Sequence, residues 1–459
     1  MTGVPNMKAF WKTFLLLFVG LGLGAYAYFV DSKKPSAAEA KDKKEKIFAT
    51  LERDKVKGIS VDKPEGDSVR LVKEGTDWKL TAPSAAPADE TQIDSMLTTL
   101  TTAEVQRVVA EQPESLATFG LDKPRMTLAI TADGAKEPLQ LQIGNKTPDE
   151  TNLYAKSPAT ARVFIVQAHI EETFAKKPFD LRDRRVLHVK RGDVKTLDIE
   201  GPEGKYTLAL KDKDLWVITS PVKSLAGRWS VDGLLGSLEN LQMDEIAAED
   251  AKDLKAFGLD KPARTVVLGL QDGAARRLEI GKPIDDTKEK FFAREASRNL
   301  VVKIPQAIST DLAKGLAELR AKRLLDVAAY EVNGIELTVD GQKRTLTRSS
   351  SKDADGVDNY KWKKTAPETK DLETNTVQDA LFQIGAVEVA EFVDTPAAPA
   401  TYGFDAPALK VTLSQEGKAS TWIELARKDG AVYARRDGDE AVLNLDAKGG
   451  DLIEAFKKL

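Results

Sequence analysis

The sequence predicts an α+β fold of three tandem homologous modules, each a mostly antiparallel sheet with one or two amphipathic helices, after a single N-terminal transmembrane helix. Three observations lead to this prediction. One set of short motifs occurs three times in the same order. Around each set, apolar and polar residues alternate, and one helical stripe interrupts the alternation. Residues 13–30 form an apolar run without charge.

The repeat is defined by motifs that keep their order and spacing. The tryptophan motifs WKLTAP, WVITSP and WKKTAP begin at Trp78, Trp216 and Trp362. The hexapeptides are FGLDKP at 119–124, FGLDKP at 257–262 and YGFDAP at 402–407. A third landmark lies at Gly144, Gly281 and Ala426, and the tetrapeptides LYAK, FFAR and VYAR follow it. Together these landmarks predict repeat modules over residues 48–187, 188–325 and 326–459.

Within each copy, alternating segments such as SVRLVKEG and MTLAITAD predict strands. Between the tryptophan motif and the hexapeptide, apolar residues recur at i, i+3, i+4 and i+7, which predicts a helix with one buried face. The stripes are Ile93, Met96, Leu97 and Leu100; Val231, Leu234, Leu235 and Leu238; and Val377, Ala380, Leu381 and Ile384. Asp89 or Thr91, and Ser230, are placed to cap these helices.

The hexapeptide favours a structural interpretation. Its glycine suits a left-handed residue just past a short helix, and its flanking apolar residues would pack into the core. Its Asp and Pro would turn the chain into the next strand, with the Asp bonding nearby backbone. The alternative is a ligand site repeated three times. The tryptophan-to-proline motif is likewise interpreted as a core anchor that precedes a loop.

Composition excludes several classes of function. The formal charge of −4 comes from 68 basic and 72 acidic residues that are interspersed, so no basic stripe predicts nucleic-acid binding. The chain has no cysteine, which excludes disulfides, thiolate metal sites and a lipid-modified N-terminal cysteine. This composition is consistent with a protein that works outside the reducing cytosol.

The N-terminal segment predicts membrane attachment. We expect a cytoplasmic tail over 1–12, a transmembrane signal-anchor over 13–30 and a charged tether over 31–47. The alternative is a signal peptide cleaved after Ala27. Lys8 and Lys12 favour a cytoplasmic N terminus, whereas the larger number of lysines in the tether favours the opposite orientation. Because exported chains commonly begin with a short basic tail and one apolar segment, we expect a single-pass inner (cytoplasmic) membrane protein with extracytoplasmic, periplasmic modules.

Gly20 and Gly24 form a small-xxx-small pair, which would let two such helices approach closely and form a homo-oligomer.

No residue stands out as catalytic, cofactor-binding or metal-binding, and no cofactor is predicted. His169 and His188 have no equivalents in the other copies. The segment IGKP at 280–283 lacks the other residues of a phosphate loop, and KDADGVD at 352–358 lacks the closing glutamate of a calcium loop. Asp122, Asp260 and Asp405 recur in all three hexapeptides, which indicates a turn rather than catalysis.

The apolar N terminus, the lysine-rich tether, the W…TAP motif and the YGLD-x-P-like hexapeptide together resemble a bacterial envelope family. It is known as domain of unknown function 4340. Members are often encoded beside ABC-transporter components of the gliding-motility type. The resemblance implies a membrane transporter as partner and supplies no active site.

The sequence therefore predicts a membrane-anchored extracytoplasmic scaffold or accessory protein that partners ABC-transporter subunits and is not an enzyme. Two alternatives stay open: an envelope protein that binds lipid or glycan along the repeat array, and an enzyme of unknown type. A continuous apolar concavity would favour the binder, and separate closed cores would favour the scaffold. A polar pocket with perturbed carboxylates in one copy would favour the enzyme.

Overall fold

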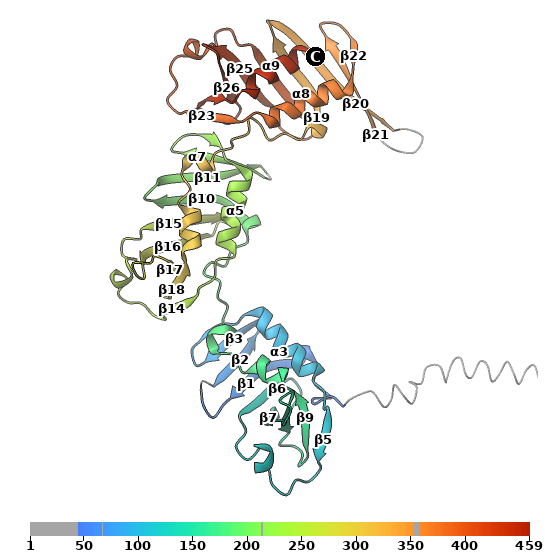
Figure 1. Ribbon diagram of the computed structural model, residues 1–459, viewed down its shortest axis with the longest axis vertical. Helices are drawn as coiled ribbons and strands as arrows, with labels where there is room; N and C mark the ends of the chain where they lie inside the picture. Colours follow the sequence, from blue (N-terminus) through green and yellow to red (C-terminus); the bar gives the residue numbers. More distant parts are fainter. Residues whose placement is uncertain (1–44, 67, 213, 353–357) are drawn as a thin grey trace, which may run out of the picture. The chain divides into compact units, whose positions relative to one another are not determined.

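The computed structural model describes residues 45–66, 68–212, 214–352 and 358–459 (Figure 1). The chain divides into two compact units, of which the first ends at Asp183 and the second covers Arg184–Leu459. The first unit contains one nine-stranded sheet and the second contains two. Each sheet corresponds to one copy of the repeat, and every strand pair in them is antiparallel.

Module 1 begins with a short 3-10 helix and ends with another. Its elements are η2 (Arg53–Lys55), β1 (Val56–Asp62), β2 (Val69–Glu74), β3 (Asp77–Ala82), β4 (Ala86–Pro87), α3 (Glu90–Thr102), β5 (Arg107–Ala110), η3 (Ala117–Phe119), β6 (Met126–Ala132), β7 (Leu139–Lys146), β8 (Asn152–Lys156), β9 (Val163–Gln167), α4 (His169–Phe174) and η4 (Pro178–Leu181).

Module 2 repeats this order and closes with two short α-helices. Its elements are η5 (Arg191–Asp193), β10 (Val194–Gly201), β11 (Gly204–Asp212), β12 (Leu215–Ser220), β13 (Ser224–Leu225), α5 (Arg228–Glu239), β14 (Glu245–Ala248), η6 (Lys255–Phe257), β15 (Arg264–Leu270), β16 (Ala275–Pro283), β17 (Lys290–Glu295), β18 (Val301–Pro305), α6 (Gln306–Leu312) and α7 (Leu316–Leu319).

Module 3 has a longer second hairpin and closes with one helix. Its elements are η7 (Ala329–Glu331), β19 (Val332–Val339), β20 (Gln342–Lys352), β21 (Asp358–Ala366), β22 (Lys370–Leu372), α8 (Thr374–Ala386), β23 (Val389–Val393), η8 (Pro399–Tyr402), β24 (Leu409–Gln415), β25 (Thr421–Lys428), β26 (Ala431–Arg436), β27 (Val442–Leu445) and α9 (Lys448–Lys457).

The three sheets have the same topology. In module 1 the strand order is β4-β3-β2-β1-β6-β7-β8-β9-β5, and modules 2 and 3 repeat it with their own strands. The helices α3, α5 and α8 each follow the strand at one edge and precede the strand at the opposite edge. Each helix therefore carries the chain across one face of its sheet, and this explains why each has a single buried stripe.

The predicted helix stripes are confirmed in all three modules, because every stripe residue is buried. The caps are confirmed only in part. Asp89 caps α3 by accepting a hydrogen bond from the backbone N–H of Gln92. In module 2 the capping position holds Gly227, and Ser230 instead donates its hydroxyl to the carbonyl of Glu318. Glu318 belongs to α7, and this short helix packs beside the first turn of α5.

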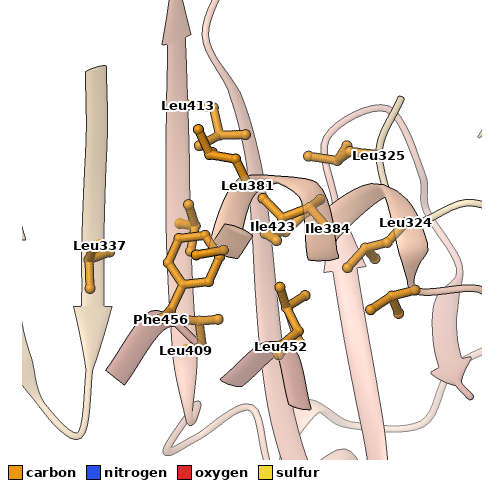
Figure 2. Close-up of a cluster of buried hydrophobic side chains, with 14 of the residues drawn as sticks. Leu324, Leu325, Leu337, Leu381, Ile384, Leu409, Leu413, Ile423, Leu452 and Phe456 are labelled. Atoms are coloured by element: carbon orange, nitrogen blue, oxygen red, sulfur yellow. The ribbon is translucent and has the colours of Figure 1, made fainter. Parts of the chain in front are cut away.

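The core of module 3 includes residues from the segment that leads into it (Figure 2). Leu324 and Leu325 are almost fully buried and belong to the same cluster as Leu381, Ile384 and Phe456. Val217 and Leu225 of module 2 belong to that cluster too. These contacts join modules 2 and 3 inside one compact unit.

The predicted fold class requires correction. The sheets are not mostly but wholly antiparallel, and the modules are sheet-rich, with the helices filling one face. The predicted transmembrane helix over 13–30 is not part of the described fold, because these residues, Gly20 and Gly24 among them, lie outside the described part of the chain. In that part, no helix is long and apolar enough to span a bilayer. The supported fold is three sheet-rich modules.

Candidate functional site

The three hexapeptides form the same turn in each module. Each follows a 3-10 helix, and its glycine has positive φ: 67° at Gly120, 68° at Gly258 and 85° at Gly403. A side chain at such a position is disfavoured, which explains why glycine recurs there. The predicted left-handed helix stop is therefore confirmed.

The aromatic residue of each hexapeptide packs against a ring of the tetrapeptide that follows it, LYAK, FFAR or VYAR, which we call the YA-type motif. Phe119 lies 5.1 Å from Tyr154, Phe257 5.1 Å from Phe292 and Tyr402 5.1 Å from Tyr433 between ring centroids, each edge to face. The residue after the glycine is buried in every copy: Leu121, Leu259 and Phe404. Both partners of each ring pair are thus set by the repeat, and the motif fastens a loop to the sheet.

The third landmark lies directly under the hexapeptide. A Cβ on Gly144 would lie 2.2 Å from the carbonyl oxygen of Phe119, and one on Gly281 would lie 2.2 Å from that of Phe257. Module 3 has Ala426 at this position, fully buried against Phe404 and Val442. Because a methyl group fits there, the hexapeptide of module 3 stands further from its strand.

The three repeated aspartates do not form a reaction site. Asp122, Asp260 and Asp405 are all exposed, one in each module. Among the described residues no hydrogen bond reaches their carboxylates, so the expected bond to nearby backbone is wrong. Exposure to solvent accounts for a charged residue here, and the glycine and the aromatic ring hold the turn.

The tryptophan motif ends in a cis proline in every copy, at Ala82–Pro83, Ser220–Pro221 and Ala366–Pro367. Trp216 and Trp362 are buried, and Trp78 is half-buried against its core. The carbonyls of Trp78 and Trp216 accept hydrogen bonds of 3.0 Å from Ala88 and Ala226. The interpretation as a core anchor before a loop is confirmed.

The remaining sequence features do not converge on a site. His169 and His188 are exposed. The IGKP segment belongs to β16, so its residues are extended in a sheet rather than curled around a phosphate. Most of KDADGVD lies outside the described residues. Within the described ranges, no group of three His, Asp or Glu side chains is arranged to hold a metal ion.

The junction of modules 2 and 3 contains a buried guanidinium. Arg436, at the end of β26, is fully buried and forms an ion pair with Asp439, which is also buried. It donates hydrogen bonds to the carbonyls of Arg323, Leu324 (3.1 Å) and Ala321 (2.9 Å), all on the segment between the modules. Burial lowers the pKa of Arg436, and the Asp439 carboxylate opposes that shift.

The turn after Arg436 reaches back into module 2. A carboxylate oxygen of Asp439 accepts a 3.0 Å bond from the N–H of Leu225, and the N–H of Glu440 donates to the carbonyl of Lys223 at 3.0 Å. A Cβ on Gly438 would lie 2.6 Å from a methyl of Leu225. Module 3 therefore closes over the short strand β13, and glycine is required where the two approach.

Arg320 forms the second contact of this junction. Its side chain is 3% exposed, lies 4.6 Å from the ring centroid of Phe392 and pairs with Asp394 at 2.6 Å. The ring and the carboxylate both come from β23 and the loop after it. Arg320 belongs to the segment LRAKRLL at 319–325, which repeats LRDRRVL at 181–187. Sequence reasoning did not identify its charged contacts, because their partners lie far away in the sequence.

Module 2 reverses the charges of the Arg436 site. Glu295 and Arg298 occupy the positions of Arg436 and Asp439 relative to the YA-type motif. The guanidinium of Arg298 pairs with Glu295 at 3.5 Å and donates to the carbonyl of Val186. Val186 corresponds to Leu324, so a guanidinium binds the same carbonyl of the incoming segment in both modules.

Module 2 also buries a charge inside its sheet. Arg264 is 6% exposed and forms bonds of 2.7 and 3.0 Å to both carboxylate oxygens of Glu203, and a third bond of 2.8 Å to the carbonyl of Leu312. The hydrogen bond from Arg264 lowers the pKa of Glu203. The two parallel hydrogen bonds to the carboxylate offset the free-energy cost of removing the guanidinium from water.

The geometry defines a tandem-repeat protein of antiparallel-sheet modules with closed cores and a charged, buried junction. The chain belongs to the DUF4340 family. The family model, a domain of unknown function, matches residues 78–215 and 216–407. Both matches begin at the tryptophan of a repeated motif, and the second runs past Trp362 to the end of the third hexapeptide.

No curated protein matches the sequence. Among solved structures, a DNA polymerase sliding clamp from Pseudomonas aeruginosa, crystallised with ligand, aligns at 8% identity over 86% of this chain and 92% of that chain. The TM-score is 0.15, which is too low to carry an argument.

Proposed function

We propose that the protein is a non-enzymatic scaffold or accessory protein that works on the extracytoplasmic side of the membrane and partners an ABC-type transporter. The observation that carries this proposal is the junction of modules 2 and 3. A protein that holds partners in register needs modules that keep a fixed relation to each other. Here that relation rests on the buried Arg436 and Arg320 and on the shared apolar cluster.

The distribution of apolar residues supports a scaffold over a lipid or glycan carrier. In modules 1 and 3 the large apolar side chains are enclosed between the sheet and its helices. Of the exposed large apolar residues in the described part of the chain, Tyr330, Tyr360 and Phe382 lie on or beside α8, and the others are scattered over separate strands and helices. A carrier would need such residues to line one continuous groove. Export and the transporter partner rest on the sequence and the family resemblance.

The test is crosslinking of the full-length protein in its native cells, followed by solubilisation, pull-down and mass spectrometry. An unrelated exported protein with the same tag serves as control. We expect ABC-transporter subunits to be enriched over that control. Recovery of lipid or glycan without any protein partner would refute the scaffold and favour the ligand binder.

A further inference from the structure

The outer face of the long helix differs between the modules. In module 1, Arg53 of η2 pairs with Asp94 on α3 and donates a 3.2 Å hydrogen bond to Thr98. In module 2, Arg191 of η5 pairs with Asp232 on α5 at 3.1 Å. These ion pairs give the face a polar surface, as expected for a helix that meets only solvent.

Module 3 has uncharged residues at the same positions. The helix stripes align Asp94 and Thr98 with Gln378 and Phe382, and the first strands align Arg53 with Ala329. Next to Ala329 stands Tyr330. Phe382 is 75% exposed and Tyr330 is 73% exposed, and η7 lies against α8. Compared with module 1, module 3 therefore lacks the arginine of the 3-10 helix and the aspartate of the long helix, and η7 and α8 each carry an exposed aromatic ring instead.

The arginine Arg348 borders this surface. Arg348 of β20 donates to the carbonyl of Tyr330, and its guanidinium lies 4.6 Å from the ring centroid of Tyr360. Within the described residues, no Asp or Glu pairs with Arg348. Tyr360, at 40% exposure, lies beside the start of α8, because its carbonyl accepts a hydrogen bond from Thr374. We call Tyr330, Arg348, Tyr360 and Phe382 the aromatic surface of module 3.

We propose that the aromatic surface of module 3 docks a protein partner that presents an apolar pocket beside a carboxylate. Phe382 and Tyr330 supply the rings that fill the pocket, and Arg348 supplies the charge that the carboxylate pairs with. Exposed Phe, Tyr and Arg are residues that protein interfaces concentrate near their centre. The proposal rests on the proposed function, since it assigns the scaffold's partner to one face.

Other occupants fit this surface less well. Two rings exposed by three quarters offer roughly 300 Å² of apolar area, below the about 800 Å² per partner of a stable interface, so any protein partner must add contacts around them. A second copy paired face to face would oppose ring to ring and Arg348 to Arg348, which the like charges disfavour. A lipid surface is disfavoured by Asp379, which lies one helical turn before Phe382. Its carboxylate would be repelled by anionic headgroups, whereas the rim of a protein interface accommodates it.

The test places a photo-crosslinking phenylalanine derivative at position 382 of the full-length protein in native cells. The matched control carries the same derivative at position 98, the equivalent position on α3. We expect a crosslink to a transporter subunit at position 382 that is at least 10-fold stronger than at 98. Equal crosslinks at both positions, crosslinks to lipid only, or no crosslink at 382 would overturn the proposal.

A second arm separates this surface from the proposed function. The variant Phe382→Thr with Tyr330→Asp copies module 1, and we expect it to lower recovery of the partner at least 10-fold with an unchanged circular dichroism melt. The control Trp229→Thr, which removes an equally exposed aromatic from α5, should change recovery less than 2-fold. If the unsubstituted protein recovers transporter subunits and the double variant recovers as many, the surface proposal fails while the proposed function stands. If the unsubstituted protein recovers none, both fail.

Discussion

Modules 2 and 3 share one sheet topology, but each buries an arginine at a position where the other has none. Module 3 buries Arg436 and Asp439 at its junction with the preceding segment. Module 2 buries Arg264 within the sheet, paired with Glu203. Arg264 is paired across the sheet with Ile280. The equivalent positions of modules 1 and 3 hold Met126 and Leu409, which are paired in the same way with the next strand. A charge in the core is therefore replaceable by an apolar side chain, whereas the junction needs hydrogen-bond donors for backbone carbonyls.

The largest effect should follow from removing the junction donor. Arg436→Met leaves Asp439 buried without its ion partner and three carbonyls without a donor. We expect a loss of about 3–5 kcal/mol in the free energy of opening module 3. Native-state hydrogen exchange at amides of β26 and β19 measures it module by module, which global unfolding of a multidomain chain does not.

The equivalent change in module 2 sharpens the comparison. The Arg298 side chain is 34% exposed and donates to one carbonyl of the incoming segment, so Arg298→Met should cost only about 1–2 kcal/mol at the amides of β17. Equal losses in the two modules would mean that burial of the guanidinium does not determine the strength of the junction.

A loss between those of Arg436→Met and Arg298→Met should follow from a methyl group under the hexapeptide of module 1. Gly144→Ala places a Cβ against the carbonyl of Phe119, and the loop must shift as a whole. We expect a cost of roughly 2–3 kcal/mol, seen as faster exchange in β7. The reciprocal change Ala426→Gly removes one buried methyl and should cost about 1 kcal/mol in module 3. If Ala426→Gly cost more than Gly144→Ala, the hexapeptide loops of modules 1 and 3 would not differ in their distance from the strand below them.

The ion pair between Arg264 and Glu203 in module 2 should be replaceable when both residues are changed together. Glu203→Gln alone leaves Arg264 buried beside a neutral partner and should cost about 1–2 kcal/mol, reduced by the partial exposure of position 203. Glu203→Gln with Arg264→Met should cost less, because two homologous modules hold an apolar residue there. If the double variant lost more stability than Glu203→Gln alone, an apolar residue could not replace the arginine in module 2 as it does in modules 1 and 3.

This pair also predicts a dependence of stability on pH. Arg264 holds the pKa of Glu203 below its usual range in the folded protein. The resulting stabilisation is therefore fully present above the unfolded pKa of about 4.3 and is lost as the pH falls through the folded value. In the double variant, hydrogen exchange in module 2 should lose this part of its acid sensitivity.

The smallest effect should come from the aromatic surface of module 3. Phe382 is mostly exposed, so Phe382→Thr should change the stability of module 3 by less than about 0.5 kcal/mol. A thermal melt followed by circular dichroism measures this. A large loss would place Phe382 in the fold rather than on a docking surface.

Local patterns predicted much of each module. The stripe from Ile93 to Leu100 and the glycine of the hexapeptide are dictated by helix periodicity and by a positive φ, and both are readable from neighbouring residues. The strands follow from alternation. The family assignment also followed from motifs close together in the sequence, and the family match over two repeats is consistent with it.

What sequence reasoning missed depends on residues far apart in the chain. Arg436 is charged and is the last residue of a strand of ordinary pattern, so nothing local marks it as buried. Its burial is caused by carbonyls more than a hundred residues earlier. The exposed residues Tyr330 and Phe382 could have been found by aligning the three copies position by position. The arginine and the aspartate that modules 1 and 2 share on these two elements are both replaced by uncharged residues in module 3.

The return of the Gly438–Glu440 turn onto Leu225 and Lys223 has a consequence for biosynthesis. A ribosome completes module 2 before the residues that cover β13 have been made. That strand and Leu225 stay uncovered until the Gly438–Glu440 turn has emerged. Because domains generally fold in the order in which they are synthesised, module 2 folds before this cover is available, and β13 is covered only when module 3 folds. Unit 2 then reaches its native state as a pair of modules.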